Sequence, residues 1–193
     1  MPTIEILGFA QSTFVRTVRM AAIEKGVEHV LSPLAFKSPE HFAKHPFGKM
    51  PILLHGKMRL HESLAIADYI DERFAGPKLK SKEILARARM WQCVSVCQME
   101  AYPVLVSAGL GVKGVEGFDP AATARVLDWL NESCDGTLAS DAGVSLADLF
   151  AAPIVAFHVS LMGAERTIGP RPQLGAWFDA ISGRSSFQET SAP

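Results

Sequence analysis

The apolar pattern of this 193-residue chain changes its character once, at the Gly76-Pro77 pair. Before that pair, alternating runs and helical stripes follow one another as strand, helix, strand, then strand, strand, helix. After it only helical periodicity recurs, which predicts a small α/β unit followed by an all-helical unit. We therefore expect one domain over residues 1–75, a linker at 76–80 and a helical domain over 81–193.

The first unit contains four short strand candidates and two longer helical stripes. The His55-Gly56 pair predicts a tight hairpin between the last two strands. Pro39 and Pro46 interrupt the long connection before it, which leaves room for one additional helical turn near residues 40–43. The expected strands are residues 3–7, 28–34, 52–54 and 58–60, and the expected helices are 12–25 and 62–74.

The second unit contains helical segments separated by proline and glycine. Pro103 is expected to bend or end the first of them, and Asp119-Pro120 has the residue types that begin a helix. Ser145 and Asp148 have the spacing of a capping box. The expected helices are residues 81–108, 119–134, 145–161 and 171–182.

Composition excludes several classes of function. Lys and Arg total 19 against 20 for Asp and Glu, so the chain lacks the basic charge of a nucleic-acid-binding protein. No apolar run approaches the ~18 residues of a membrane span, and the first residues lack the pattern of a signal peptide. Three cysteines, an odd number, argue against a disulfide framework and predict a cytoplasmic protein.

Apparent nucleotide and metal motifs fail for separate reasons. Gly109–Gly114 matches GxGxxG, but no helix begins after it, so a flexible loop is expected. His41 and His45 are four residues apart without a third ligand, and both are expected on the surface. Cys93 and Cys97 share one helix face and are expected to be buried as small apolar residues. No metal site is expected.

One constellation remains, at the boundaries of the first unit's elements. Met50-Pro51 precedes a short strand and is a candidate for a cis peptide, which would turn the main chain of Met50 outward to pair with a peptide-like ligand. Glu62-Ser63 begins one helix and Ser12 begins another, where side chains and N–H groups can bind an anion. Taken singly, each is better explained as an ordinary helix cap or strand boundary, and only their joint occurrence in this order, ahead of a helical unit, favours a binding site.

The residues in this order resemble the glutathione S-transferase family, and most closely its phi-like branch. The resemblance covers nearly the whole chain, residues 94–118 excepted, and it implies a thioredoxin-like N-terminal domain followed by an all-helical C-terminal domain. The matching segments are Ser12-Thr13 with Arg16 and Val18, Lys37–His41, Pro46–Pro51, Leu60–Ser63 with Ala65-Ile66, Val144–Asp148, and Arg171-Pro172 with Trp177.

The resemblance also implies a role for each site residue. Ser12 would donate a hydrogen bond to the sulfur of glutathione, with Thr13 as the competing donor. The main chain of Met50, ahead of Pro51, would pair with the cysteinyl backbone. The two ends of the γ-glutamyl group would be held by Glu62 and Ser63, and the glycyl carboxylate would lie near Lys37 and Lys49.

Four departures from the phi-like pattern stand out. Phe36 stands where members often carry a histidine for the glycyl end, and Lys49 replaces a glutamine. His45 replaces an asparagine, and Leu64 replaces an arginine often found at the dimer interface. The resemblance nonetheless implies a homodimer, in which the apolar Phe47 is either exposed for a partner or packed under its own loop.

The implied activity is conjugation of glutathione, as co-substrate, to a small hydrophobic electrophile in detoxification, with Ser12 catalytic. The helical domain would contribute the electrophile pocket, together with Phe9 and residues 102–110. Serine at position 12 cannot perform the disulfide exchange that cysteine would. Two alternatives stay open: a non-catalytic ligand-binding or partner-docking protein, and a glutathione-dependent peroxidase or isomerase of the same fold.

Overall fold

The computed structural model describes residues 4–111, 117–135, 138 and 143–191, and it divides into two compact units. Unit 1 comprises Met1–Leu79 with Ser185–Pro193, and unit 2 comprises Lys80–Arg184. The sequence assigned the last residues to the helical domain, whereas the short helix α9 (Ser185–Thr190) packs against α1 (Thr13–Glu24) in unit 1. That part of the expected division is wrong.

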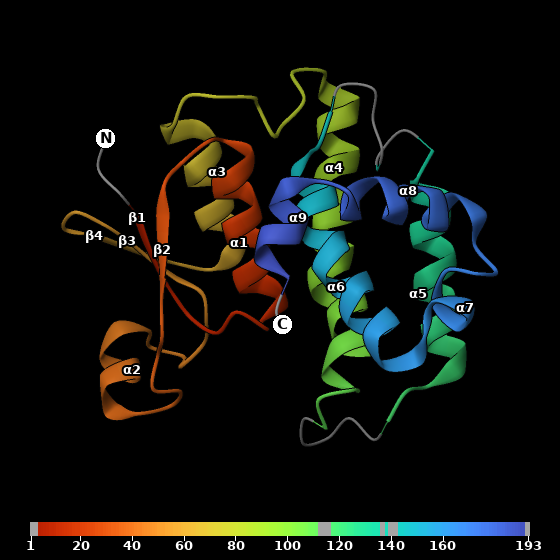
Figure 1. Ribbon diagram of the computed structural model, residues 1–193, viewed down its shortest axis with the longest axis horizontal. Helices are drawn as coiled ribbons and strands as arrows, with labels where there is room; N and C mark the ends of the chain where they lie inside the picture. Colours follow the sequence, from red (N-terminus) through yellow and green to blue (C-terminus); the bar gives the residue numbers. More distant parts are fainter. Residues whose placement is uncertain (1–3, 112–116, 136–137, 139–142, 192–193) are drawn as a thin grey trace. The chain divides into compact units, whose positions relative to one another are not determined.

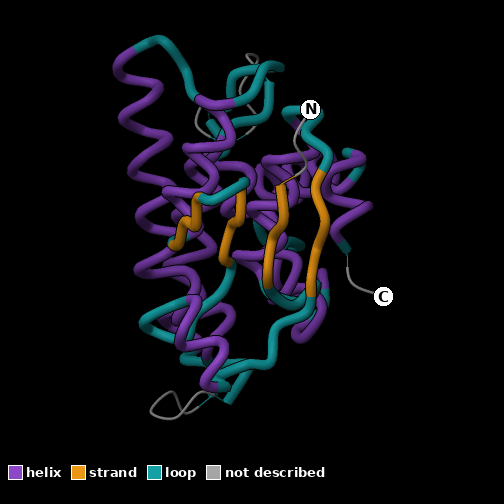
Figure 2. The backbone as a smooth tube through the Cα atoms, turned by 90° about the vertical axis from the view of Figure 1, so that its left-hand side faces the viewer, coloured by secondary structure: helices purple, strands orange, loops and turns teal. Residues whose placement is uncertain are grey.

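Unit 1 is built on a four-stranded sheet in the order β2-β1-β3-β4 (Figure 2). β1 pairs in parallel with β2 and antiparallel with β3, which forms a hairpin with β4. This sheet agrees with the thioredoxin-like domain expected from the sequence. The strands are β1 (Ile4–Leu7), β2 (His29–Ser32), β3 (Ile52–His55) and β4 (Met58–His61).

Two helices, α1 and α3 (Ser63–Arg73), pack against each other on one side of this sheet (Figure 1). Their apolar stripes meet the inward side chains of the strands, and Ile6, Val18 and Ile66 are completely buried. The expected extra turn is α2 (Pro39–Lys44), which is capped by Ser38 and lies between β2 and β3 along the chain.

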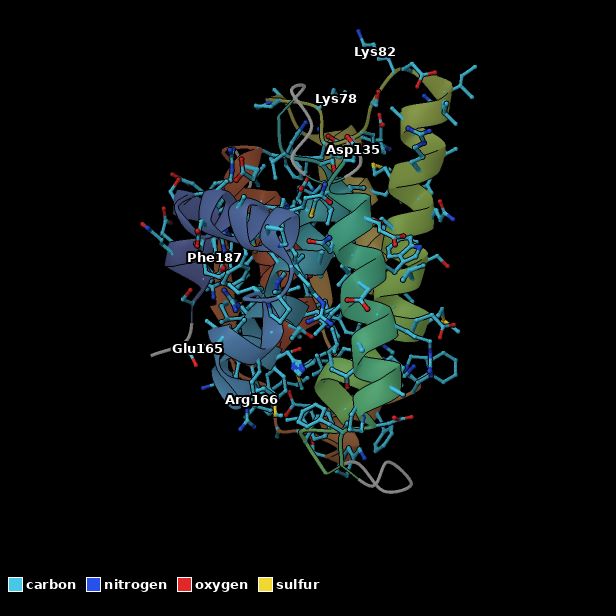
Figure 3. The ribbon with its side chains drawn as sticks, turned by 90° about the vertical axis from the view of Figure 1, so that its right-hand side faces the viewer. Lys78, Lys82, Asp135, Glu165, Arg166 and Phe187 are labelled. Carbon is cyan, nitrogen blue, oxygen red and sulfur yellow. The ribbon has the colours of Figure 1, made fainter. Side chains whose placement is uncertain are left out.

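α9 is fastened to α1 by polar and aromatic contacts. The Arg16 guanidinium lies 4.7 Å from the ring centroid of Phe187, a residue labelled in Figure 3, and donates to Ser191 Oγ at 3.3 Å. Arg19 donates to the Glu189 carbonyl at 3.2 Å. Burial lowers the pKa of Arg16, but such a shift leaves a guanidinium charged in the neutral range.

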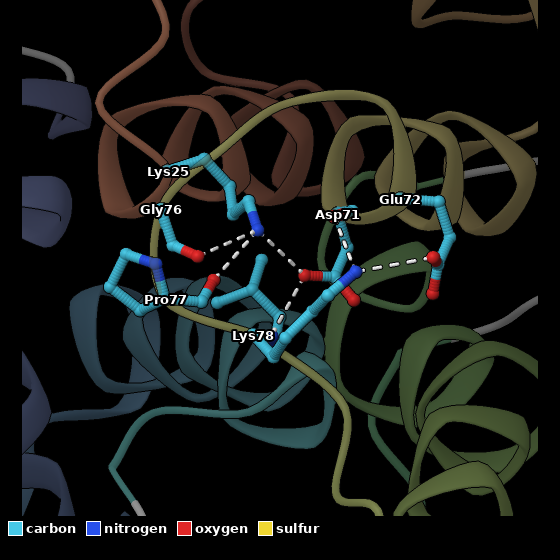
Figure 4. A network of polar contacts seen from close by, with 7 residues as sticks. Lys25, Asp71, Glu72, Gly76, Pro77 and Lys78 are labelled. Carbon is cyan, nitrogen blue, oxygen red and sulfur yellow. Dashed lines mark hydrogen bonds and ion pairs between the residues drawn. The ribbon is translucent and has the colours of Figure 1, made fainter.

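A buried ion pair fixes the residues that leave α3 (Figure 4). Lys25 Nζ donates to Asp71 Oδ1 at 3.1 Å and to the carbonyls of Gly76 and Pro77 at 3.4 and 2.8 Å. The Leu79 N–H donates to the same carboxylate oxygen at 2.9 Å. The segment that the sequence indicated as a linker is therefore held to unit 1 through most of its length.

Among its described residues, unit 2 is entirely helical. Pro103 does not end the first helix, because i to i−5 bonds, from Ala108 N–H to the Pro103 carbonyl at 3.2 Å for example, continue it as π-helix. Gly114 of the expected loop lies outside the described residues. The elements are α4 (Ile84–Val96), η1 (Cys97–Ala101), η2 (Pro103–Ser107), α5 (Pro120–Ser133), α6 (Leu146–Met162), α7 (Ala164–Thr167) and α8 (Pro172–Ser182).

Asp148 joins two helices of unit 2. Its Oδ2 accepts from the Ser145 N–H at 2.7 Å and from Ser145 Oγ at 2.8 Å, as the capping-box spacing predicts. Its Oδ1 accepts from Trp177 Nε1 at 2.8 Å, a contact between α6 and α8 that spacing along the chain does not reveal. The carboxylate is 2% exposed, so these bonds lie away from water.

Two thiols of unit 2, those of Cys93 and Cys134, have raised pKa values. Cys93 and Cys97 are buried, as expected, and their mutual hydrogen bond together with burial raises the pKa of Cys93 well above its usual range. Burial also raises the pKa of Cys134 to about 12. Because the thiolate is the reactive form, the raised pKa makes Cys93 and Cys134 poorly reactive.

Within the described ranges, no helix combines the length and the hydropathy needed to cross a bilayer.

Candidate active site

Four residues form a row across one end of the sheet in unit 1. Leu7, the last residue of β1, pairs with Ser32 at the end of β2 and with Ile52 at the start of β3. Ile52 in turn pairs with His61, the last residue of β4. One end of each strand therefore lies in this row, and the loops attached there gather on the same side of the sheet. In Figure 2 this side is the one farther from the chain terminus marked N.

Every site residue inferred from the sequence lies within five positions of that row. Gly8, the first residue after the row in β1, touches the opposite loop: a Cβ on it would lie 3.6 Å from Cβ of Met50 and 2.5 Å from Cγ2 of Val15. Only glycine leaves room for these loops to approach so closely. The site residues gathered at this end are Ser12, Lys37, Lys49, Met50, Pro51, Glu62 and Ser63.

Ser12 is the N-cap of α1 and is half-buried. Its Oγ accepts from the Val15 N–H at 3.4 Å, and its own N–H donates to the Phe9 carbonyl at 3.1 Å. A hydroxyl has one proton and two acceptor positions, so accepting this bond leaves the proton of Ser12 free for another partner. The helix-cap interpretation and the sulfur-donor interpretation are therefore compatible.

Thr13, the competing donor, is less accessible. The residue is 4% exposed, and its Oγ1 has no hydrogen-bond partner within the part of the chain that the structure describes. A hydroxyl enclosed by protein atoms is less available to a ligand than the half-buried hydroxyl of Ser12. The geometry favours Ser12 over Thr13.

The opposite side of the site is formed by the start of β3 and the start of α3. The Met50–Pro51 peptide bond is cis, as the sequence indicated. Glu62 is the N-cap of α3 with a φ of 66°, a left-handed conformation that is costly for a residue with a side chain, and its carboxylate is exposed. Ser63, the first residue of α3, is 5% exposed. The first N–H groups of a helix bind anions, so this corner suits a carboxylate.

Lys37 and Lys49 supply positive charge at the same end. Both side chains are exposed, and neither ammonium group forms an ion pair with a described residue. The Lys37 Nζ lies 5.4 Å from the ring centroid of Phe36, and the backbone φ of Lys37 is 59°. Two unpaired cations near a helix N-terminus favour an anionic ligand.

The expectation of surface histidines is wrong. His41 is 0% and His45 is 1% exposed, because the segment from α2 to β3 folds back on the sheet and its backbone groups need partners. His45 Nδ1 accepts from the Phe47 N–H at 3.2 Å, and its ring centroid lies 4.5 Å from that of His61. Burial and the neighbouring His61 lower the pKa of His45. The four-residue spacing of His41 and His45 in the sequence does not indicate that they are buried and bond the backbone of this segment.

The cavities described in unit 1 lie apart from this site. Two cavities, of about 410 and 590 Å³, are lined by residues around Gly26–Glu28 and include none of the candidate residues. No group of three or more His, Cys, Asp or Glu side chains within the described segments could hold a metal ion.

Comparison with known proteins agrees with this arrangement. Residues 7–78 match the family model "Glutathione S-transferase, N-terminal domain". Glutathione S-transferase F10 of Arabidopsis thaliana is 35% identical over 172 residues, covering 81% of this chain and 79% of its own. Glutathione S-transferase F9 of the same plant is 31% identical over 190 residues, covering 88% of each chain.

Solved structures show the same fold at lower identity. A serine-to-cysteine mutant of poplar glutathione transferase F1 superposes with a TM-score of 0.82 at 24% identity, over 98% of this chain and 97% of that one. A glutathione S-transferase from Methylobacillus flagellatus, solved with glutathione bound, gives 0.81 at 20% identity, over 98% and 100%. The N-terminal family match, the fold and the two Arabidopsis relatives agree. The chain belongs to the glutathione S-transferase family and, within it, to the phi-like branch.

Proposed function

We propose that this transferase conjugates the thiolate of glutathione to a small hydrophobic electrophile, with Ser12 as the catalytic residue. Catalysis would come from holding the two reactants together and from stabilising the thiolate, with no covalent intermediate on the protein. The observation that carries the proposal is the Ser12 hydroxyl at the positive end of α1, which accepts from the Val15 N–H and keeps its own proton for a ligand.

The remaining groups at this end of the sheet suit the rest of the tripeptide. The main chain of Met50, ahead of the buried Pro51, would pair with the cysteinyl backbone. Glu62 would take the γ-glutamyl amino group, and Ser63 with the first N–H groups of α3 would take its carboxylate. Lys37 and Lys49 would bind the glycyl carboxylate through their unpaired ammonium groups.

Exposed aromatic side chains support a hydrophobic second substrate. Phe9, in the loop that leads to Ser12, is 39% exposed, and Phe36 is 48% exposed. Their ring centroids lie 5.9 Å apart at an angle of 60°. An aromatic pair of this kind offers apolar area to a ligand held near Ser12.

We also propose a homodimer that acts in cytoplasmic detoxification. Phe47 is 70% exposed, which excludes the alternative that it packs under its own loop. Its backbone is held by the buried His45, so the apolar ring is presented outward by a fixed turn. Three free cysteines suit a reducing compartment.

The test compares three reactions of the purified protein with glutathione. Conjugation is followed with a chlorinated aromatic electrophile, peroxide reduction with an organic hydroperoxide, and isomerisation with an unsaturated ketone. We expect saturable turnover of the chlorinated aromatic and retention of the protein on immobilised glutathione.

Two results would contradict the proposal. Retention on glutathione without turnover of any electrophile would favour a ligand-binding protein. Turnover of the hydroperoxide or the ketone alone would move the function to reduction or isomerisation, chemistry that the same thiolate site can perform.

A further inference from the structure

His41 makes two hydrogen bonds to the backbones of the two lysines at the candidate site. Its Nδ1 accepts from the Lys37 N–H at 2.9 Å, and its Nε2 lies 2.8 Å from the Lys49 carbonyl oxygen. A backbone N–H can only donate and a carbonyl can only accept, so the ring is neutral and carries its proton on Nε2. The imidazole thus joins two residues that are twelve positions apart in the chain.

The packing around His41 fixes the direction of both bonds. The side chain is 0% exposed, and the rings of Phe36 and Phe42 lie on it with centroids 5.6 and 6.1 Å away. Lys37 is held with a φ of 59°, a conformation that a residue with a side chain adopts at a cost, and the bond from its N–H to His41 offsets part of that cost.

The fold of α2 does not depend on the imidazole. Ser38 Oγ caps the helix by accepting from the His41 N–H at 3.1 Å, and the His45 N–H donates to the His41 carbonyl at 2.8 Å. These bonds use the backbone of His41 and would survive a change of its side chain. The ring itself acts on the positions of Lys37 and Lys49.

We propose that His41 is a positioning residue for the glycyl end of glutathione. By joining the two lysine backbones it fixes the separation of the points from which the two side chains start, and so limits how far apart their ammonium groups lie when both meet one carboxylate. This inference rests on the proposed function. It assigns to a buried side chain, which does not touch the ligand, a part in selecting thiols that end in a free carboxylate.

The test uses two thiols that differ only at that carboxylate: glutathione, and its glycyl monoethyl ester. His41→Phe keeps an aromatic ring at this position and removes both hydrogen bonds. For this variant we expect KM for glutathione to rise about tenfold, with kcat within twofold of the native value. For the ester, whose glycyl end carries no charge, we expect KM of the variant and of the native protein to agree within twofold.

Two further variants complete the design. His41→Gln can donate to the Lys49 carbonyl but offers no acceptor at the Nδ1 position, so its KM for glutathione should lie between those of the native protein and His41→Phe. His55→Phe is the matched control, because His55 lies at the other end of β3 and bonds the Tyr69 hydroxyl at 2.9 Å. Its KM for both thiols should be unchanged.

The possible failures are distinguishable. If the native protein neither binds nor turns over either thiol, the proposed function fails and the inference fails with it. If the native protein prefers glutathione but His41→Phe raises KM equally for both thiols, or lowers only kcat, His41 has a general structural role and the inference alone is overturned. Should His41→Phe not fold, a native KM for glutathione in His41→Gln overturns it.

Discussion

The hydroxyl of Ser12 would serve two partners, the Val15 N–H at the start of α1 and the sulfur of a bound thiol. A free thiol with a pKa of ~8.5 is only a few per cent ionised at neutral pH. Lowering that pKa by about two units requires ~2.7 kcal/mol. One hydrogen bond to a charged group contributes about 1.5–3 kcal/mol, so Ser12 can supply most of this stabilisation.

We expect Ser12→Ala to lower turnover at neutral pH by about 10–100-fold. The loss should shrink as pH rises towards the pKa of free glutathione, because solvent then ionises the thiol without help. Affinity for glutathione should fall little, since in the proposed function Met50, Glu62 and Ser63 would hold the rest of the tripeptide. Steady-state kinetics across this pH range provide the measurement.

Thr13→Val is the matched control for that substitution. It replaces the neighbouring Thr13 hydroxyl by a methyl group of similar size. That hydroxyl is buried and makes no hydrogen bond to a described residue. Turnover should stay at the native level, and stability should not fall. A damaged Thr13→Val beside a fully active Ser12→Ala would transfer the role of donor to Thr13.

The places of site residues in the fold were predictable from the sequence where they follow from position in an element. Ser12 and Ser63 stand at helix starts and Met50-Pro51 at a strand start, so their convergence follows from the topology of the sheet. The burial of His41 and His45 depends on how a loop folds back in space. No periodicity along the chain encodes such a contact, which is why both were expected on the surface.

At the scale of elements, Asp148 at the start of α6 connects that helix to α8. We expect Asp148→Ala to destabilise the protein by about 2–4 kcal/mol, because it leaves the Ser145 and Trp177 donors without their charged acceptor. Thermal unfolding measures the change. Glutathione affinity of the folded variant should be native, since Asp148 lies outside unit 1.

Asp128→Ala is the control for this prediction. Asp128 also pairs with a partner on another segment, accepting from Arg171 Nε at 2.8 Å, but its side chain is 61% exposed. Exposed ion pairs contribute about 0–1 kcal/mol, so this substitution should change the unfolding temperature little. Equal effects of the two substitutions would show that the burial of Asp148 is not what gives its bonds their strength.

Most elements were predictable because each has a long apolar stripe or a cap. The helix that contains Pro103 was expected to bend or end there, but π-helical bonding bypasses the missing N–H and the chain stays helical to Ser107. α9 is only six residues long and its packing partner, α1, is far away in sequence, so neither its existence nor its place was visible.

For the whole molecule, three histidines whose pKa is lowered in the folded state make stability depend on acid. His158 is 2% exposed and stacks on Phe118, and burial, followed by the charge of Arg171, lowers its pKa. Burial also lowers the pKa of His29 and His45. The unfolded chain then binds more protons than the folded one below the ordinary histidine pKa of ~6.5.

We therefore expect the free energy of unfolding to be fully developed above about pH 6.5 and to fall as the pH decreases below it. His158→Phe removes one of these groups while keeping an aromatic ring against Phe118. The difference in unfolding temperature between pH 7.5 and pH 5.5 should be smaller in this variant than in the native protein. An unchanged difference would assign the acid sensitivity to other groups.

The assembly of two chains is testable at Phe47. We expect Phe47→Ser to shift sedimentation at micromolar concentration from the dimer towards the mass of one chain, because the variant loses an apolar ring that is 70% exposed. Val30→Ser, at a residue 52% exposed on the edge strand β2, should leave the dimer intact. If the native protein sediments as a single chain, the proposal of a homodimer is wrong.

Because α9 belongs to unit 1 but follows unit 2 in the chain, the ribosome completes unit 1 only after it has made unit 2. Ribosomal synthesis delivers β1 to α3 first, but the surface of α1 that receives Phe187 stays without its cover until unit 2 has also been made. A fragment that stops near residue 79 is therefore an unfinished domain, although it holds every residue of the candidate site. A permuted chain in which α9 precedes β1 would instead carry unit 1 as one continuous stretch, able to fold before unit 2 exists.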